Sequence, residues 1–515
     1  MGQRVLIIGA GPGGLTAGML LAARGYQVEI FEKADCVGGR NAAMHIGPYK
    51  FDTGPTFLMM TRALEELFAD ASRDIKEYLD LRKLDPLYRL RFPGGVDFFP
   101  TDDEARMLRE VERVFPGQSE AYRRYRQQES RKLDVVYPCL RTPYMMLTSY
   151  LSRNLLRALP HLDAFTSVYN RLASYFDAEH LRIAMTFQAK YLGMSPWKCP
   201  ATFTILSLIE HRYGIYHPIG GLNAISTAMA KVIGELGGQI HLNTPVKQIL
   251  SQKRKATGLL LTSGQEVHGD AVIINPDFAW AMQNLLKPQD RRTYTDRKLS
   301  SYEYSCSTFM LYLGLNKQYD IPHHNVFFAD DYKANVLDIT QNMRLSADPS
   351  FYVQNAVVTD DTLAPPGHSS IYVLVPVPNQ TSGIDWAKEA GPFRDLMIKR
   401  IQERTELKDL SQHIVAERII SPMQWQQDHS IYAGATFNLA HTLGQMLYFR
   451  PHNRSEELAN AYIVGGGTHP GSGLPTIYQS GRIAADLIVR DLPKSEPRPP
   501  RRRAAMEGFE PRVTP

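Results

Sequence analysis

The sequence predicts an α/β protein that opens with a strand–helix–strand unit. Residues 4–10 (RVLIIGA) form a short apolar run rich in β-branched side chains, which is typical of a buried parallel strand. A helical pattern over residues 13–24 ends at Gly25, and residues 27–32 (QVEIFE) form a second strand. Two strands joined by a helix are expected to be parallel, so this unit predicts a Rossmann-like sheet at the N-terminus.

A glycine loop joins the first strand to its helix. Gly9 permits a tight turn, Gly11 lets a pyrophosphate approach the backbone, and Gly14 lets the helix pack closely on the strand. The start of the helix offers free N–H groups and a partial positive charge to phosphates. Glu32 ends the second strand, where its carboxylate can accept hydrogen bonds from ribose hydroxyls. The loop therefore predicts a dinucleotide site, although it does not distinguish NAD from FAD.

A second set of glycines follows this unit. Gly39 and Arg40 would bring a fixed cation to the same pyrophosphate, and the segment 51–56 (FDTGPT) follows them. This combination resembles the extended FAD signature of amine oxidases and carotenoid desaturases. The resemblance implies FAD as the cofactor, with Gly54, Pro55 and Thr56 among the residues that bind it.

A third glycine-rich segment lies near the C-terminus. A short strand at 462–464 runs into a loop that contains Gly466, Gly467 and Gly473, and Pro475 suits the first turn of the next helix. We expect these glycines to bring backbone N–H groups to the flavin. Val246 is also predicted to contact the cofactor. The alternative for the loop is a simple turn, and His469 within it is expected to be structural and not a catalytic base.

The remaining patterns predict two domains. Residues 61–210 are expected to be mainly helical and irregular, whereas 305–315 and 370–378 are expected to form strands of a second sheet. Further expected elements are a helix at 225–236, strands at 239–242, 246–250 and 271–275, and a helix at 475–490. We therefore predict a discontinuous FAD-binding domain and a mixed α+β substrate-binding domain. The first comprises residues 1–60, 215–290 and 455–492, and the second comprises 61–214 and 291–454.

Composition favours a peripheral rather than an integral membrane protein. No stretch approaches the ~18 apolar residues of a spanning helix. The four cysteines form no Cys-x-x-Cys pair, so neither a disulfide framework nor a metal site is expected, and a cytoplasmic location fits best. The net charge of +5 comes partly from a basic, proline-rich tail at 493–515. This tail is expected to be disordered, with attraction to anionic lipid as the alternative. No nucleic-acid-binding motif is present.

Beyond the cofactor segments, the chain resembles the bacterial and fungal carotenoid desaturases, which include phytoene desaturase and dehydrosqualene (diapophytoene) desaturase. The matching blocks include 51–60 (FDTGPTFLMM), 167–193, 216–222 (YHPIGGL), 324–332, 363–379, 448–454 (YFRPHNR) and the GTHPGSGLP loop. The resemblance implies an amine oxidase or GR2-type flavoprotein fold. It also implies an FAD-dependent enzyme that dehydrogenates a linear C30 or C40 polyene in carotenoid biosynthesis. The electron acceptor would be a quinone or O₂.

Residues 141–159 (RTPYMMLTSYLSRNLLRAL) are expected to form an amphipathic helix that lies on the membrane surface. Packing into the core is the alternative. Some family members carry an Asp-x-x-Arg pair here as a candidate acid and base, and the matching positions are Asn154 and Arg157. Because Asn cannot accept a proton, the base stays open, and Arg153 and Arg157 are the candidate catalytic residues.

Two other functions remain possible from the sequence. A carotene cis–trans isomerase or a polyene oxygenase of the same superfamily would share the FAD segments. A non-catalytic, GDI-like binder of prenylated proteins has a related fold but would have degenerate phosphate-binding glycines. Gly9, Gly11 and Gly14 are all present, which disfavours this second alternative.

Overall fold

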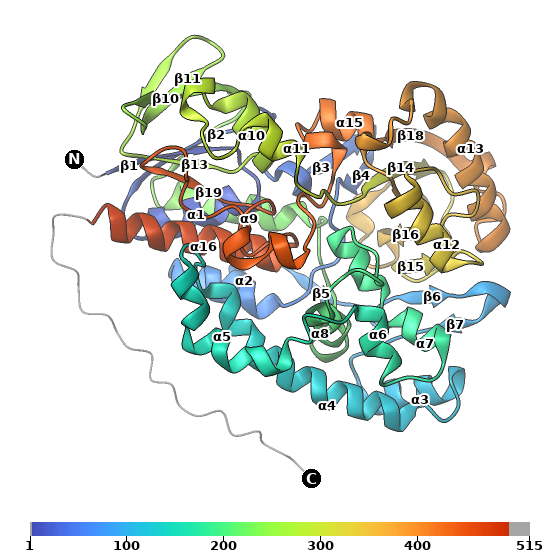
Figure 1. Ribbon diagram of the computed structural model, residues 1–515. Helices are drawn as coiled ribbons and strands as arrows, with labels where there is room; N and C mark the ends of the chain where they lie inside the picture. Colours follow the sequence, from blue (N-terminus) through green and yellow to red (C-terminus); the bar gives the residue numbers. More distant parts are fainter. Residues whose placement is uncertain (1–2, 494–515) are drawn as a thin grey trace.

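The computed structural model of the chain describes residues 3–493 and contains two main sheets (Figure 1). The predicted basic tail at 493–515 lies outside these residues apart from Pro493.

The first sheet is parallel and has the strand order β19-β13-β1-β2-β9. Its strands are β1 (Arg4–Ile8), β2 (Gln27–Phe31), β9 (Gln239–His241), β13 (Ala271–Ile274) and β19 (Ala461–Ile463). One face packs against α1 (Pro12–Ala23), α9 (Asn223–Glu235) and α16 (Leu474–Asp491). The other packs against α10 (Phe278–Leu285) and an antiparallel sheet of β10 (Val246–Gln252), β11 (Lys255–Leu261) and β12 (Glu266–His268). The predicted Rossmann-like sheet is confirmed. The domain boundaries stay a prediction.

The second sheet is mixed, with the order β18-β14-β17-β16-β15-β6-β7. Its strands are β6 (Arg89–Arg91), β7 (Asp97–Phe98), β14 (Ser307–Leu315), β15 (His324–Phe327), β16 (Phe351–Asn355), β17 (Ser369–Val377) and β18 (Ile414–Ile420). Helix α13 (Trp386–Arg404) covers one face of this sheet, and the opposite face packs against the helical part of the molecule. β6 and β7 come from the region predicted to be helical. Such short strands carry no clear period, and their place is set by the pairing of β6 with β15 and of β7 with β6.

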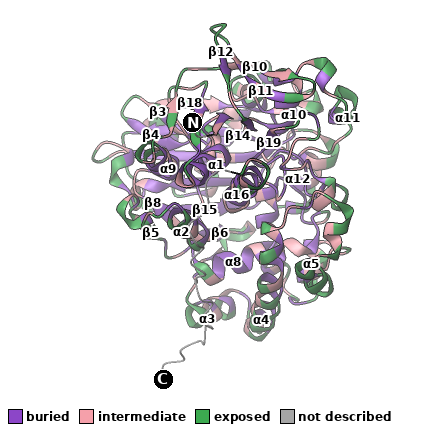
Figure 2. Ribbon diagram, turned by 90° about the vertical axis from the view of Figure 1, so that its left-hand side faces the viewer, coloured by how far each residue is buried: buried purple, intermediate pink, exposed green. Residues whose placement is uncertain are grey.

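The helical part lies beneath both sheets in Figure 1. It consists of α2 (Thr61–Asp70), α3 (Glu104–Val114), α4 (Ser119–Val136), α5 (Arg153–Ala158), α6 (Val168–Ala173), α7 (Glu179–Ala184) and α8 (Ile205–Tyr213). The remaining elements are β3 (Ala43–Ile46), β4 (Tyr49–Asp52), β5 (Leu81–Lys83), β8 (Tyr216–Pro218), α11 (Asp296–Ser300), α12 (Tyr332–Leu337), α14 (Leu410–His413) and α15 (Pro422–Gln427). In Figure 2 the central strands are largely buried, and exposed residues gather on outer helices such as α3, α4 and α5.

The expected continuous helix at 141–159 is wrong. The segment contains a short 3₁₀ turn at Leu147–Leu151 and then α5, and the two are separated by Ser152. Ser152 has an extended backbone (φ −61°, ψ 139°), and its hydroxyl accepts a hydrogen bond from the N–H of Leu155 at 3.4 Å. A serine that caps a helix in this way ends the preceding turn, and this outweighs the apolar periodicity. Among the described residues, no helix is long and apolar enough to cross a membrane.

Candidate functional site

A single cavity of about 2020 Å³ connects the two sheets. It begins at the glycine loop after β1 and passes the aromatic face of the second sheet. It then reaches the surface beside the segment that follows α5. Pockets for small molecules usually measure about 300–1,000 Å³. This cavity therefore has room for a dinucleotide and a long apolar chain together.

The loop after β1 forms the predicted cradle. Gly9 has a positive φ of 89°, and Gly11 occupies the N-cap position of α1 and lines the cavity. Gly14 does not line it; a Cβ there would lie 2.5 Å from the carbonyl oxygen of Gly9, so this glycine permits close packing. Asn275, at the end of β13, donates its side-chain N–H to the Gly9 carbonyl at 3.0 Å and supports the turn. Sequence reasoning missed Asn275, because its partner is distant in the chain.

Glu32 and Val246 lie at the same end of the cavity. The Glu32 carboxylate accepts hydrogen bonds from the N–H groups of Ala10 (2.6 Å) and Ala34 (2.9 Å), which hold it in place at the end of β2. Its remaining lone pairs can accept hydroxyl groups of a ribose. Val246 contributes an apolar wall beside Trp280, which suits a purine ring.

Arg40 and Gly39 stand beside this cradle. A Cβ on Gly39 would lie 3.5 Å from the Cα of Gly11, so the two loops touch. Arg40 lines the cavity and donates to the carbonyl of Thr436 at 2.6 Å. Burial lowers the pKa of its guanidinium, and the charge of Asp277 opposes this shift. Within residues 3–493 no carboxylate forms an ion pair with Arg40. A phosphate in the cradle would supply the direct ion pair that Asp277 does not form with Arg40.

The segment that contains Gly54, Pro55 and Thr56 forms the middle of the cavity wall. A Cβ on Gly54 would lie 2.7 Å from the carbonyl oxygen of Arg40, so only glycine fits there. The hydroxyl of Tyr372 on β17 donates to the Gly54 carbonyl at 2.7 Å. The second sheet therefore holds this cofactor segment in place.

The C-terminal glycine loop closes the cradle from the other side. Gly466 and Gly473 line the cavity, and α16 starts directly after Gly473. Gly467 does not line it; a Cβ there would lie 2.5 Å from the side chain of Phe278, which makes this glycine a packing position.

Arg450 holds that loop, and sequence reasoning missed it although it lies in the YFRPHNR block. Its guanidinium is buried and donates to the carbonyls of Gly466 (2.6 Å) and Thr468 (3.1 Å). It also donates to carbonyls in 439–445. Burial lowers its pKa to about 9.

The far end of the cavity is aromatic and apolar. Phe57, Tyr191, Tyr352 and Tyr372 line its centre, and Phe57 packs against both Tyr191 and Tyr352 with ring centroids 5.5 Å apart. At the mouth lie the exposed side chains of Leu159, Phe165, Leu443 and Phe449. Such a passage can surround a hydrocarbon and exclude water.

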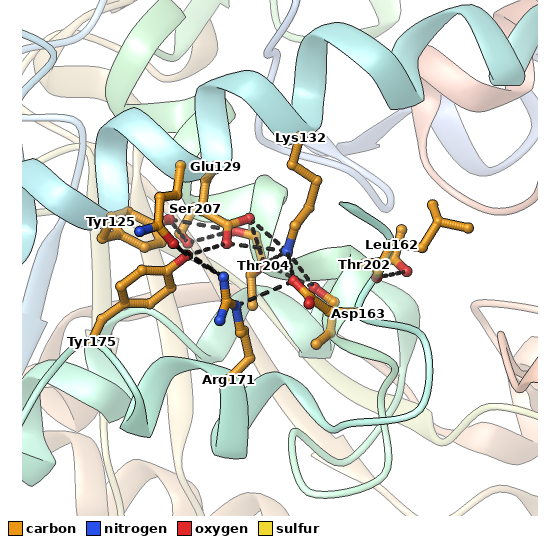
Figure 3. Close-up of polar contacts among 12 residues, drawn as sticks. Tyr125, Glu129, Lys132, Leu162, Asp163, Arg171, Tyr175, Thr202, Thr204 and Ser207 are labelled. Atoms are coloured by element: carbon orange, nitrogen blue, oxygen red, sulfur yellow. Dashed lines mark hydrogen bonds and ion pairs between the residues drawn. The ribbon is translucent and has the colours of Figure 1, made fainter. Parts of the chain in front are cut away.

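A buried ionic cluster fixes the segment at the mouth (Figure 3). Lys132 on α4 is 3% exposed, and its ammonium lies 3.1 Å from Glu129 and 2.8 Å from Asp163. Asp163 also pairs with Arg171 at 3.2 Å. Because Asp163 lies two residues before Phe165, the cluster holds the exposed Phe165 at the cavity entrance.

Arg153 and Arg157, the candidate catalytic residues, are not at the site. Both are exposed on α5 and neither lines the cavity, whereas Leu155 between them is buried. The helix turns its apolar side inward and its charged side toward water, so a substrate inside the cavity does not reach either arginine. Within residues 3–493, no group of His, Cys, Asp or Glu side chains could hold a metal ion.

The chain matches the family model of flavin-containing amine oxidoreductases over residues 12–489. It is 51% identical to a 4,4'-diapophytoene desaturase (4,4'-diapolycopene-forming) from Methylomonas, covering 94% of this chain and 95% of the relative. It is 37% identical to a neurosporene-forming phytoene desaturase from Rhodobacter capsulatus, with 96% and 95% covered. Its fold resembles that of an oxidoreductase from Methanosarcina mazei, with a TM-score of 0.63 at 15% identity, covering 94% of this chain and all of that one.

The chain thus belongs to the flavin-containing amine oxidoreductases and, within them, to the carotenoid desaturases. Its cofactor is FAD, as predicted. The residues described above fit that cofactor, because the glycine cradle, the fixed Glu32 carboxylate and the Arg40 guanidinium, which forms no ion pair among the described residues, line the same cavity.

Proposed function

We propose that this carotenoid desaturase acts on a linear C30 polyene, with 4,4'-diapophytoene as its first substrate. One observation carries the proposal: an apolar cavity runs without interruption from the cofactor cradle to the surface. The choice of C30 over C40 is supported by the higher identity to the diapophytoene desaturase, 51% against 37% for the phytoene desaturase.

The chain contributes binding and exclusion of water. A hydrocarbon offers no charge, so its affinity comes from apolar burial, at about 25 cal/mol per Å². The aromatic rings of Phe57, Tyr191 and Tyr352 hold the chain beside the segment 54–56. Bound FAD supplies the hydride acceptor. Each cycle adds one double bond, and the product still fits the same passage.

Coexpression with a synthase tests the substrate. In cells that make either 4,4'-diapophytoene or phytoene, we expect coloured, multiply desaturated products from both, with the larger yield from the C30 precursor. Both should react because an apolar pocket discriminates by only ~1–3 kcal/mol per methylene. The measurement is chromatography of extracted pigments with their absorption and mass.

Colourless extracts from both strains, in the presence of FAD-loaded protein, would contradict the desaturase assignment. Products of unchanged mass but altered geometry would favour the isomerase, and added oxygen would favour the oxygenase. Incubation of the purified enzyme with a quinone or with O₂ alone identifies the electron acceptor.

We further propose that the cavity mouth rests on the cytoplasmic surface of a membrane. Large apolar side chains are exposed around it: Met146, Leu147, Leu151, Leu156, Leu159, Phe165, Leu443 and Phe449. Phe165 is 99% exposed and Leu151 72%. Arg153 and Arg157 point outward from the same segment and suit anionic lipid headgroups. A polyene could then enter from the bilayer without crossing water.

Replacing two of these side chains should release the protein. Each apolar side chain withdrawn from lipid costs about 2 kcal/mol of binding free energy. The double variant Phe165→Asp/Leu151→Asp should therefore bind vesicles several hundred-fold more weakly, since 1.4 kcal/mol corresponds to about tenfold. Its FAD content should not change. The measurement is cosedimentation with vesicles of anionic phospholipid.

The matched control is Val96→Asp/Val415→Asp, which changes two exposed apolar side chains elsewhere on the surface. It should sediment like the wild type. Equal sedimentation of both double variants would refute membrane attachment through the mouth.

A further inference from the structure

A buried cluster of histidines lies behind the aromatic wall of the cavity, and nothing above gives it a role. It consists of His217 on β8, His323 and His324 at the start of β15, Tyr352 on β16, and Asp360. All five side chains are at most 9% exposed. Burying this many titratable groups is costly unless each of them is paired, so the cluster calls for a function.

The groups form a chain that leads away from the cavity. The Tyr352 hydroxyl lies 2.7 Å from Nδ1 of His324. The ring of His323 lies 4.4 Å from that of His324 and 4.8 Å from that of His217, measured between centroids. At the far end, Nε2 of His217 lies 2.9 Å from the carboxylate of Asp360.

The inner end of this chain reaches the site of the reaction. Tyr352 lines the cavity, and its hydroxyl lies 3.0 Å from Oγ1 of Thr56, in the segment that forms the cofactor wall. Phe57 stacks on His324 with centroids 4.1 Å apart and separates the imidazole from the cavity. The Tyr352 hydroxyl is therefore the group of this cluster that a substrate can touch.

Two ring nitrogens in the cluster have no hydrogen-bond partner among the described residues, namely Nε2 of His324 and Nδ1 of His217. When Tyr352 donates to Nδ1 of His324, the proton of His324 is on Nε2, which becomes a free donor. When His217 donates from Nε2 to Asp360, its Nδ1 is a free acceptor. The ring of His323 lies between these two rings, and among the described residues no hydrogen bond joins His324 to His217.

Burial sets the charges of the cluster. It lowers the pKa of His324 and His323 well below the usual value, so both imidazoles are neutral before the reaction. Burial opposes ionisation of Asp360, but hydrogen bonds from His217, Thr362 and the N–H of Gly220 hold its pKa at about 2. Asp360 therefore stays ionised. The neighbouring residues Asp361 and Thr362 are exposed, which places solvent next to this end.

We propose that Tyr352 is a catalytic residue that removes the substrate proton and that His324 takes up the phenolic proton of Tyr352. This inference rests on the proposed desaturase function. One C–H bond of the polyene breaks with its electron pair, and the hydride passes to the flavin, so the substrate is oxidised by two electrons. The adjacent C–H bond then breaks, and its electrons form the new double bond. The released proton goes to the oxygen of Tyr352 while the phenolic proton passes to Nδ1 of His324.

A neutral phenol suffices as the acceptor because loss of the hydride leaves the carbon chain electron-deficient, which makes the neighbouring C–H bond strongly acidic. After the product leaves, His324 returns the proton from Nδ1 to the oxygen of Tyr352, and Tyr352 releases its own proton to water in the emptied cavity. This restores the starting state, with the His324 proton on Nε2.

The test compares two tyrosines in the FAD-loaded enzyme. Tyr352→Phe keeps the ring but removes the hydroxyl, and anaerobic reduction of the flavin by 4,4'-diapophytoene should slow by about 100-fold, the usual scale of general acid–base catalysis. Its KM should not change. The control is Tyr122→Phe, because the hydroxyl of Tyr122 is also buried and lies 3.1 Å from Nδ1 of a histidine, His211, but does not line the cavity. That variant should react within about twofold of the wild type.

Two further measurements do not depend on the variant Tyr352→Phe. Nitrogen-15 spectra of histidine-labelled protein without substrate should place the His324 proton on Nε2. Asp360→Asn, which lies outside the cavity and hydrogen-bonds His217 but neither Tyr352 nor His324, should reduce the flavin within about twofold of the wild type. Equal rates for Tyr352→Phe and Tyr122→Phe, or a His324 proton on Nδ1, would overturn the proposed role of Tyr352 and His324. A wild-type enzyme whose flavin no polyene reduces would instead refute the desaturase function itself.

Discussion

Gly11→Val is expected to yield a folded protein that contains less than about a tenth of the wild-type FAD. Gly11 has φ −76° and ψ 170°, a backbone that valine also adopts, so the substitution does not strain the chain. A Cβ there would lie 3.0 Å from the side-chain amide of Asn275 and would project into the cradle at the start of α1. The methyl groups would then occupy the space that the pyrophosphate needs. The measurement is flavin absorbance per mole of purified protein after reconstitution.

The control for this variant is Gly391→Val. Gly391 lies within α13, far from the cradle, and a Cβ there meets no atom within 4 Å. It should retain the full FAD content. If Gly11→Val binds FAD as tightly as this control, the glycine loop is not the pyrophosphate site.

Lys132→Met is expected to lower the free energy of unfolding by about 3–5 kcal/mol. The variant removes the ammonium that pairs with Glu129 and Asp163, and Glu129 is fully buried. An uncompensated carboxylate in the interior costs more than the original ion pair contributes. The hydroxyl groups of Thr204 and Tyr175, at 2.6 and 3.1 Å from Glu129, replace only part of the lost interaction (Figure 3). Urea unfolding measures the loss.

The control is Arg131→Met, which changes an exposed side chain at the neighbouring position. It should change the free energy of unfolding by less than about 0.5 kcal/mol. The double variant Lys132→Met/Glu129→Met should recover most of the loss, because both buried charges are then removed together. A double variant as unstable as Lys132→Met alone would show that packing of the lysine stem, and not the charge, is responsible.

The cofactor half of the site was predictable because its signals are local. Gly9, Gly11 and Glu32 lie within one strand–helix–strand unit, and their spacing is set by the geometry of that unit. The parallel sheet followed from the same unit. Family resemblance supplied the choice of FAD and the class of substrate.

The rest depends on contacts between distant parts of the chain. Arg450 joins carbonyls of the C-terminal loop to carbonyls of residues 439–445, and His217 meets Asp360 across 143 positions in the chain. No periodicity or fixed spacing in the sequence relates either residue to its partner. The expected helix at 141–159 failed for a different reason. Its apolar spacing was real, but Ser152 favoured a cap over a continuous turn.

The helices that cover one face of the parallel sheet come from opposite ends of the described chain, and this affects folding during synthesis. β1 and α1 emerge from the ribosome before α16, which packs against α1 and begins only at Leu474, about 450 residues after α1 ends. At about 5–20 residues per second, roughly 20–90 s pass between the two. Throughout that interval the glycine loop has no C-terminal wall. Insertion of the cofactor is therefore expected to follow synthesis, and nascent chains would expose the apolar faces of β1 and α1 to chaperones until α16 arrives.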